Sequence, residues 1–204
     1  RGVARGVVHL GSWTRGTHRG TSMRDCLVDH PRIVAAFASL QDRARGLGVT
    51  AYDEASTEGA LRYAWAKTDG ERVLLTIVFA GEDRAVEALG ELDEPDGVAF
   101  AFQPARGNAI RGSAARCVRG VDHLVIDGVR VGPLGFLQPN PSMMARAYDD
   151  LARDERGQPL RGDLGWDLYA GAGAMTRRLA GAFARVEAAE SDPEHTATPT
   201  SVEA

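Results

Sequence analysis

The sequence predicts two folded parts: an α+β domain with a mixed sheet over residues 1–132, and the beginning of an α/β domain over residues 133–204. The first part consists mostly of short β-rich runs with two helical segments between them. At Pro133 the pattern changes to a Pro/Asn-rich loop and a helix. A strand, a glycine-rich turn, a short helix and a second strand follow, an order typical of a parallel βαβ unit.

Composition and cysteine content indicate a globular protein of a reducing compartment. Hydrophobic residues at 44% and charged residues at 25% are ordinary globular values. No apolar run of about 18 residues occurs, so no membrane partner is expected. Cys26 and Cys117 are too few for a disulfide framework and fit the cytoplasm. We predict a cytoplasmic monomer. Because the chain opens on Arg1 rather than Met, we do not expect it to begin where its gene begins.

The net charge of −4 is unevenly distributed along the chain. Residues 1–48 contain eight arginines and three aspartates, a net charge of +5, so the remainder carries −9. A basic segment on an acidic body suits a polyanionic partner. A solvated basic face is the alternative interpretation.

The first part is expected to begin with two short strands and a helix. Arg5–Trp13 and Thr17–Met23 are β-rich and separated by a Gly/Thr turn. Pro31 suits the first turn of a helix, and Gly46 and Gly48 suit its end. The apolar stripe of this helix comprises Ile33, Val34, Phe37, Leu40, Ala44 and Leu47.

A β-hairpin is the clearest later element of the first part. Leu61–Thr68 and Val73–Phe79 are β-rich and flank Asp69-Gly70-Glu71, a strong turn signal. A short helix is expected over Glu82–Leu92. The remaining expected strands are Gly97–Gln103, Asn108–Ile110, and the pair Asp122–Ile126 and Val129–Val131, which turns at Asp127-Gly128.

The second part contains a helix over Pro141–Asp154 and then the βαβ unit. Its first strand leads into Asp167, followed by Gly171 and Gly173, and its second strand ends at Glu190. Glycines allow close approach of a ligand to the backbone, and a carboxylate at the end of the second strand can accept bonds from a ribose. The tail 191–204 lacks periodicity.

The glycine spacing argues against a dinucleotide cofactor. The fingerprint Gly-x-Gly-x-x-Gly needs a third glycine where this chain has Thr176. The pattern Asp-x-x-x-Gly-x-Gly, with Glu190 17 residues after Gly173, resembles instead the S-adenosylmethionine site of class I methyltransferases. A glycine-rich turn with no ligand is the alternative.

Two segments extend this resemblance to a family. Gly135–Pro141 reads Gly-Phe-Leu-Gln-Pro-Asn-Pro and Asp167–Ala174 reads Asp-Leu-Tyr-Ala-Gly-Ala-Gly-Ala. Together they resemble the RNA (uracil-5-)-methyltransferases, which form 5-methyluridine in rRNA or tRNA. Arg24–Pro31 and Arg106–Gly112 resemble, more loosely, two segments of that family's central, RNA-facing domain. The resemblance implies a Rossmann-like methyltransferase domain from residue 133.

The same resemblance implies a set of S-adenosylmethionine-binding residues. Gln138 offers an amide to the methionine end, Tyr169 is the aromatic contact, Gly171 and Gly173 expose the backbone, and Glu190 binds the ribose. For three of them another interpretation stays open: a loop-stabilising Gln138, a core Tyr169 and a solvated strand-end Glu190.

Cys26 matches, in one branch of the family, a ligand of a 4Fe-4S cluster. Four thiolates are the usual complement, and the other three would precede Arg1, so a buried structural Cys26 is the alternative. The family's nucleophilic cysteine lies after the cofactor motifs, which argues against Cys117 in that role. The spacing of the five histidines indicates no zinc site.

The resemblance further implies a seven-stranded methyltransferase sheet. Only its first two strands fit before the chain ends, 31 residues after Gly173. We therefore expect a piece of a longer protein that lacks the catalytic cysteine and base, and is inactive alone. Two alternatives stay open: a non-catalytic RNA-binding module with Arg15, His18, Arg19 and Arg24 on phosphates, or a class I methyltransferase with a non-RNA substrate.

Overall fold

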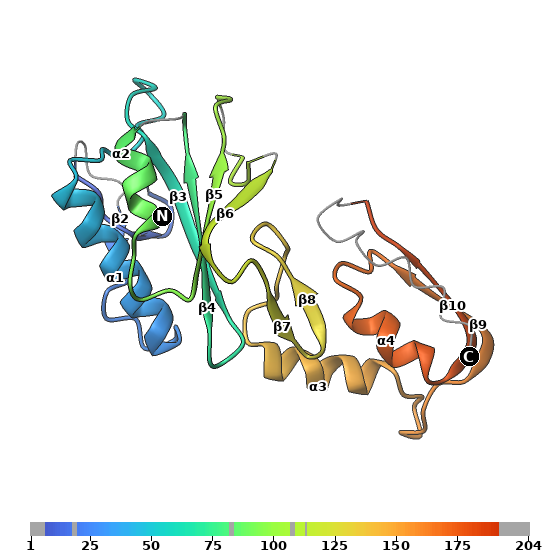
Figure 1. Ribbon diagram of the computed structural model, residues 1–204. Coiled ribbons are helices and arrows are strands. Elements are labelled where there is room, and N and C mark those ends of the chain that lie inside the picture. Colours follow the sequence, from blue (N-terminus) through green and yellow to red (C-terminus); the bar gives the residue numbers. More distant parts are fainter. Residues whose placement is uncertain (1–6, 18–19, 82–83, 107–108, 113, 192–204) are drawn as a thin grey trace. The chain divides into compact units, whose positions relative to one another are not determined.

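The computed structural model describes residues 7–17, 20–81, 84–106, 109–112 and 114–191, in two compact units (Figure 1). The units are Arg1–Leu124 and Val125–Ala204. Both combine helices and strands, as predicted. The division lies before the Asp127-Gly128 turn, whereas the predicted domain boundary follows it, because the residues around this turn bond to a helix of the second unit.

A four-stranded mixed sheet forms the framework of the first unit. Its two central strands are parallel, and each outer strand is antiparallel to its neighbour. Every residue of Val73–Phe79, the second strand across the sheet, is buried, as expected for a run that is apolar at all positions but Thr76. In sheet order the strands are β3 (Leu61–Thr68), β4 (Val73–Phe79), β5 (Gly97–Phe102) and β6 (Ala115–Gly120).

Helix α1 (Pro31–Gly46) contacts β3 and β4 and closes the core of this unit (Figure 1). It begins at Pro31 as predicted, and His30 caps it by accepting the N–H of Arg32. Leu40 and Ala44 of the predicted stripe are fully buried against the sheet. The apolar spacing of α1 therefore determines which face meets the core.

The predicted hairpin between β3 and β4 is confirmed. The Asp69 carboxylate accepts the backbone N–H groups of Glu71 and Arg72, at 3.1 and 2.7 Å. Gly70 has a φ of 99°, which favours glycine. The Arg72 guanidinium also donates to Asp69, so the turn is closed by its own side chains.

Other predicted elements are shorter than expected. The first two strands are β1 (Gly11–Trp13) and β2 (Gly20–Ser22). The helix expected over Glu82–Leu92 is α2 (Arg84–Glu87) followed by the 3-10 turn η1 (Ala88–Gly90). Gly90 is buried, and a Cβ there would lie 3.2 Å from Val118, so the chain turns tightly against the sheet.

The strand predicted at Asn108–Ile110 is wrong for Ala109 and Ile110, and Asn108 lies outside the described residues. The Arg62 guanidinium donates to the carbonyls of Gln103 and Ala105, which draws the chain out of the sheet after β5. The next strand is β6, which starts only at Ala115.

The predicted βαβ unit is present in the second unit. Its strands, β9 (Gly162–Leu168) and β10 (Phe183–Ala189), are parallel and joined by α4 (Ala174–Ala180). Helix α3 (Pro141–Leu151) precedes them and ends three residues before the predicted Asp154. The Asp154 side chain instead accepts two backbone N–H groups and forms a turn. A short hairpin comes first along the chain, β7 (Leu124–Ile126) and β8 (Val129–Val131).

The two faces of the β9–β10 pair differ in burial. Gly165, Asp167 and Val186 are buried on the face toward α4. Leu164, Trp166 and Leu168 alternate with them and are 43–61% exposed. Among the described residues, no helix is long and apolar enough to cross a membrane.

Candidate cofactor-binding site

The turn after β9 has an unusual backbone. Tyr169, Gly171 and Gly173 all have positive φ, at 62°, 56° and 83°. Glycine adopts such angles freely, whereas a tyrosine does so at a cost. A Cβ at Gly171 would meet no other atom within 4 Å. Protein packing therefore does not require this glycine, and the space beside its backbone is open to a ligand.

Glu190 lies directly beside this turn. Its Oε2 accepts the N–H of Gly171 at 2.7 Å, and its Oε1 accepts the N–H of Ser191 at 2.7 Å. The Ala170 N–H also bonds to the Ala189 carbonyl at 3.0 Å. Two predicted site residues, Gly171 and Glu190, are thus brought together by a charge-assisted hydrogen bond. Glu190 is half-buried, which argues against a merely solvated strand end.

Asp167 and Thr176 form a contact that was not predicted from the sequence. The Thr176 hydroxyl donates to Asp167 Oδ2 at 2.5 Å, and both residues are buried. The bond ties the end of β9 to α4. Thr176 occupies the position of the third glycine in the dinucleotide pattern. A hydroxyl at this position was the sequence feature that could have indicated a hydrogen bond to Asp167. The buried Asp167 carboxylate is thus bonded to α4.

Tyr169 and Gln138 are both exposed. The side chain of Tyr169 is 90% exposed, so it is not part of a core within this chain. Gln138 lies in the irregular segment before α3, two residues before Asn140, which caps that helix by accepting the N–H of Met143. The described contacts join neither residue to Glu190, so their roles at the site stay predictions.

Arg178 of α4 connects the segments of this unit. Its guanidinium pairs with Asp127 at 2.7 Å and Asp149 at 2.6 Å, and it stacks over the Tyr148 ring. Burial alone would lower the pKa of Arg178, but the two carboxylates outweigh it and raise the pKa. The neighbouring Arg177 donates to the Asp127 carbonyl. The helix that follows the glycine turn is therefore anchored to both α3 and the β7–β8 hairpin.

Cys26 lies half-buried in the loop before α1, and Cys117 on β6. Within the described part of the chain, no group of three or more His, Cys, Asp or Glu residues is placed to hold a metal ion. The iron–sulfur role of Cys26 stays a prediction.

Arginines of the basic N-terminal segment mostly bind protein partners. Arg24 Nη2 donates to both carboxylate oxygens of Asp42, at 2.7 and 2.6 Å. Arg32 and Arg43 pair with acidic residues, and Arg45 donates to the Val8 carbonyl. Of the residues expected on phosphates, Arg15 is exposed, and His18 and Arg19 lie outside the described residues. The net charge of this segment thus overstates the basic surface available to a polyanion.

A parallel βαβ unit with a glycine turn held by a carboxylate has the architecture of the cofactor site of a Rossmann-like class I methyltransferase. A solved structure agrees: the tRNA (uracil-54, C5)-methyltransferase of Pyrococcus abyssi, in complex with S-adenosyl-L-homocysteine, has a TM-score of 0.64 to this chain at 19% identity. That match covers 85% of this chain and 44% of the other. The predicted fold class is therefore confirmed.

Curated relatives are named RNA methyltransferases. One from Gloeobacter violaceus is 30% identical over 92% of this chain, and one from Halalkalibacterium halodurans 23% identical over 95%. This chain covers 43% and 44% of their lengths. No protein-family model matches. The predicted resemblance is thus confirmed at the level of RNA methyltransferases, and the chain spans less than half the length of these relatives.

Proposed function

We propose that this chain is part of an S-adenosylmethionine-dependent RNA methyltransferase that methylates C5 of uridine in rRNA or tRNA. The bond between the Glu190 carboxylate and the Gly171 N–H carries the proposal. It holds an acceptor at the mouth of a turn whose backbone has an open side. The naming of the relatives supports an RNA substrate. The uridine C5 specificity rests on the sequence resemblance around Gln138 and Tyr169.

The residues present fit the cofactor. Each carboxylate oxygen has two acceptor sites, so a Glu190 oriented by backbone N–H groups can also accept ribose hydroxyls. Gly171 and Gly173 let the cofactor approach the backbone. Tyr169 presents an aromatic ring to solvent beside the turn, and Gln138 supplies an amide for the methionine end.

The bound cofactor supplies an electrophilic methyl group. Uridine C5 becomes nucleophilic enough to accept it when a thiolate adds to C6. A general base then removes the C5 proton, and the C6–S bond breaks to release the thiolate and the methylated uracil. We propose that this cysteine and base lie outside the 204 residues, so that this chain contributes cofactor binding and RNA contacts. We further propose that the longer protein to which this chain belongs is a cytoplasmic monomer, and that Cys26 is one ligand of a 4Fe-4S cluster in it. If that longer protein contains no iron, the proposed cluster is wrong.

Nucleoside analysis tests the proposed reaction directly. Deleting the gene that encodes this chain should abolish 5-methyluridine at one or more positions of purified rRNA or tRNA, measured by mass spectrometry of each RNA class. Re-expression of the gene should restore it. Unchanged 5-methyluridine with loss of a different methylated nucleoside would keep the methyltransferase and overturn the uridine C5 assignment.

A further inference from the structure

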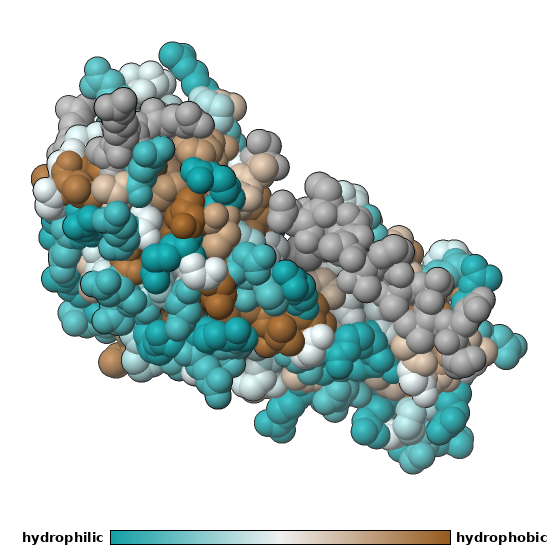
Figure 2. Space-filling view, in the orientation of Figure 1, coloured by the Kyte–Doolittle hydropathy of each residue, from teal (hydrophilic) through white to brown (hydrophobic). Residues whose placement is uncertain are grey.

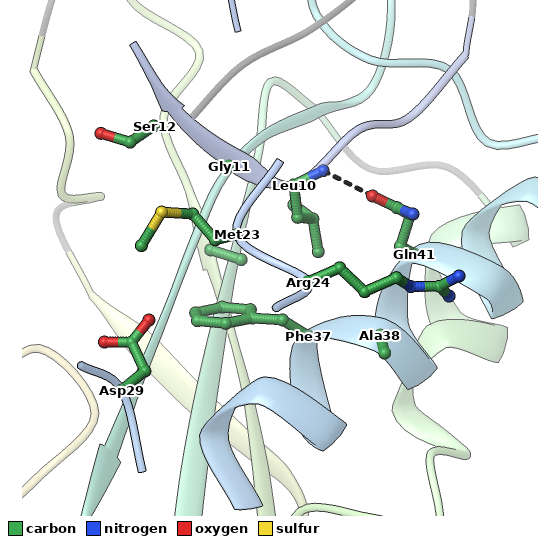
Figure 3. Close-up of a pocket in the computed structure, with 10 residues that line it drawn as sticks. Leu10, Gly11, Ser12, Met23, Arg24, Asp29, Phe37, Ala38 and Gln41 are labelled. Carbon is green, nitrogen blue, oxygen red and sulfur yellow. Dashed lines mark hydrogen bonds between the residues drawn. The ribbon is translucent and has the colours of Figure 1, made fainter. Parts of the chain in front are cut away.

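A pocket opens in the first unit between β1, the loop after β2 and α1 (Figure 3). Its volume is about 120 Å³. An apolar cavity of about 150 Å³ suffices for benzene, so this pocket has the scale of a single ring rather than a whole nucleotide. Its lining residues are Leu10, Gly11, Ser12, Met23, Arg24, Asp29, Phe37, Ala38, Gln41 and Ala64.

The walls of the pocket suit a flat ring. Figure 3 shows the ring of Phe37 at the centre of the lining group, with Met23 and Leu10 near it. Gln41 is 7% exposed, and its Oε1 accepts the N–H of Leu10 at 2.9 Å, which fixes this wall. An aromatic ring, a thioether and aliphatic groups together form the kind of surface on which unstacked bases lie.

The polar groups of the pocket suit a ligand with N–H donors. Asp29 is half-buried and accepts no hydrogen bond from any residue that the structure describes. A carboxylate at an apolar pocket is stabilised by a donor. Arg24 also lines the pocket, but it is engaged with Asp42. An aliphatic amine would satisfy Asp29 yet leave the ring of Phe37 unused, whereas a nucleobase offers N–H groups on its edge and a flat face.

The loop that supplies Met23, Arg24 and Asp29 also exposes an apolar pair. Leu27 and Val28 are 99% and 93% exposed. On the face drawn in Figure 2 the first unit is mostly hydrophilic, with apolar residues in separate small groups. Adjacent apolar side chains at a loop tip are suited to insert between stacked bases. We propose that this pocket holds one unstacked nucleobase of the RNA substrate, and that Leu27 and Val28 occupy the gap that the base leaves.

This inference rests on the proposed function only in that RNA is the partner. The base must offer N–H donors to Asp29, and guanine suits the pocket best because its six-membered ring, the part for which the pocket has room, carries N1–H and N2–H side by side. The pocket lies within the first unit and contains none of the proposed cofactor residues. The two sites can therefore be tested separately.

Fluorescence anisotropy with the full chain tests the pocket. The probe is a labelled ten-nucleotide single-stranded RNA with one guanine among uridines, and a second RNA has an abasic ribose in place of that guanine. Phe37→Leu should weaken binding of the guanine RNA about tenfold, because stacking of one base contributes about 1–3 kcal/mol. Asp29→Asn should weaken it by a similar factor, because the N–H groups of the guanine lose a charged acceptor. Leu27→Ser should weaken it as well.

Electrostatics predicts the opposite sign for Asp29→Asn. Removing a negative charge strengthens non-specific attraction to RNA, and the matched control Asp93→Asn, at an exposed site on the loop before β5, reports that effect. Weaker binding by Asp29→Asn with equal or stronger binding by Asp93→Asn therefore supports a specific contact.

A double-mutant cycle decides the assignment. If the guanine lies on Phe37, the abasic RNA should bind Phe37→Leu no more weakly than it binds the wild type. Additive losses, unchanged affinity in all variants, or no RNA binding at all would overturn the proposal. So would a Leu27→Ser variant that changes only self-association in sedimentation. Binding of S-adenosylhomocysteine, measured in the same samples, reports on the cofactor site separately. If Phe37→Leu unfolds, Asp29→Asn with its control carries the test.

Discussion

Tyr169 combines a left-handed backbone with an almost fully exposed ring. Its φ is 62°, and its side chain contributes little to the core at 90% exposure. Residues held in such backbone regions cost about 1–3 kcal/mol and cluster at functional sites. The protein thus retains a bulky residue where a glycine would fit the backbone better. This argues for a function of the ring.

Tyr169→Gly should separate folding from ligand binding. Glycine relieves the backbone strain but adds freedom to the unfolded chain, so we expect the free energy of unfolding to change by less than about 1 kcal/mol. Affinity for S-adenosylhomocysteine should fall about tenfold, because the aromatic contact is lost. Urea unfolding and calorimetry measure the two quantities. A stability loss above about 2 kcal/mol with unchanged affinity would make Tyr169 a structural residue.

The sequence predicted two neighbouring residues of the turn because glycine and a strand-end acid have few roles there. The glycines and the terminal acid of the βαβ unit define the turn, and the structure joins Gly171 to Glu190. The bond between Asp167 and Thr176 was not predicted, because an acid at a strand end fits a ligand contact as well as a helix contact. Only the direction of the side chain distinguishes these two uses.

At the scale of elements, Arg178 holds α4 in place. It reaches Asp127, Asp149 and the carbonyls of Ala145 and Ala174 from one half-buried position. A planar guanidinium can satisfy several acceptors at fixed angles, whereas an ammonium cannot. The positions of the β7–β8 turn, α3 and α4 therefore depend on this side chain.

Arg178→Lys should lower the free energy of unfolding of the chain by about 1–3 kcal/mol, because one ammonium group cannot donate to both carboxylates and both carbonyls at once. Arg185→Lys is the matched control. Arg185 pairs with Glu187 on exposed β10 and should cost less than about 1 kcal/mol. Chemical denaturation followed by circular dichroism measures both. Equal losses for the two variants would contradict the role of Arg178.

Asp69 makes the β3–β4 turn sensitive to pH. Burial acts to raise its pKa, but the backbone N–H groups of Arg72 and Glu71 and then the Arg72 guanidinium outweigh burial and lower the pKa. An acid with a lowered pKa stabilises the fold above its unfolded pKa of about 3.9. That contribution is lost as the pH falls through the lower pKa of the folded state.

Asp69→Asn should therefore destabilise the protein by about 1–2 kcal/mol at pH 7. The loss should be smaller at pH 3, because that pH lies below the unfolded pKa of about 3.9, where the stabilisation by the ionised carboxylate is already declining. Urea unfolding at both pH values gives the difference. If Asp69→Asn lowers the free energy of unfolding by the same amount at both pH values, the charge of Asp69 is not the cause of the loss.

Elements were predictable where the local signal and the tertiary contacts agree. The Asp69-Gly70-Glu71 and Asp127-Gly128 turns were located correctly, and Asp127 and Gly128 have φ values of 51° and 70°, as such a tight turn needs. The segment 109–110 was not predicted correctly, because Arg62, from a distant position in the sequence, binds the carbonyls after β5. Local propensity does not contain that contact.

At the scale of the whole molecule, the net charge of residues 1–48 does not tell how many of its arginines are available to bind a polyanion. Four arginines of the basic segment, Arg24, Arg32, Arg43 and Arg45, bind protein groups. Surface pairs of this kind are weak, yet they occupy side chains that a count of charges treats as available. The contact that we propose between the first unit and RNA is therefore the pocket around Phe37.

The fold class and the family resemblance followed from sequence because the second unit keeps its elements in order. The strand, glycine turn, helix and strand leading to an acid are all present. The relative arrangement of Gln138 and the turn did not follow, because Gln138 lies in an irregular segment. We therefore propose the turn 169–173 and Glu190 as the methyl-donor site.

Calorimetric titration of the chain with S-adenosylhomocysteine tests that claim most directly. Glu190→Gln keeps an oxygen that can accept the Gly171 N–H but removes the charge, and Glu155→Gln removes an equal charge from the exposed loop after α3. We predict binding to wild type and to Glu155→Gln, and binding at least about tenfold weaker to Glu190→Gln, since hydrogen bonds to a charged group contribute about 1.5–3 kcal/mol. Equal affinity for all three proteins, or no binding to wild type, would contradict the account.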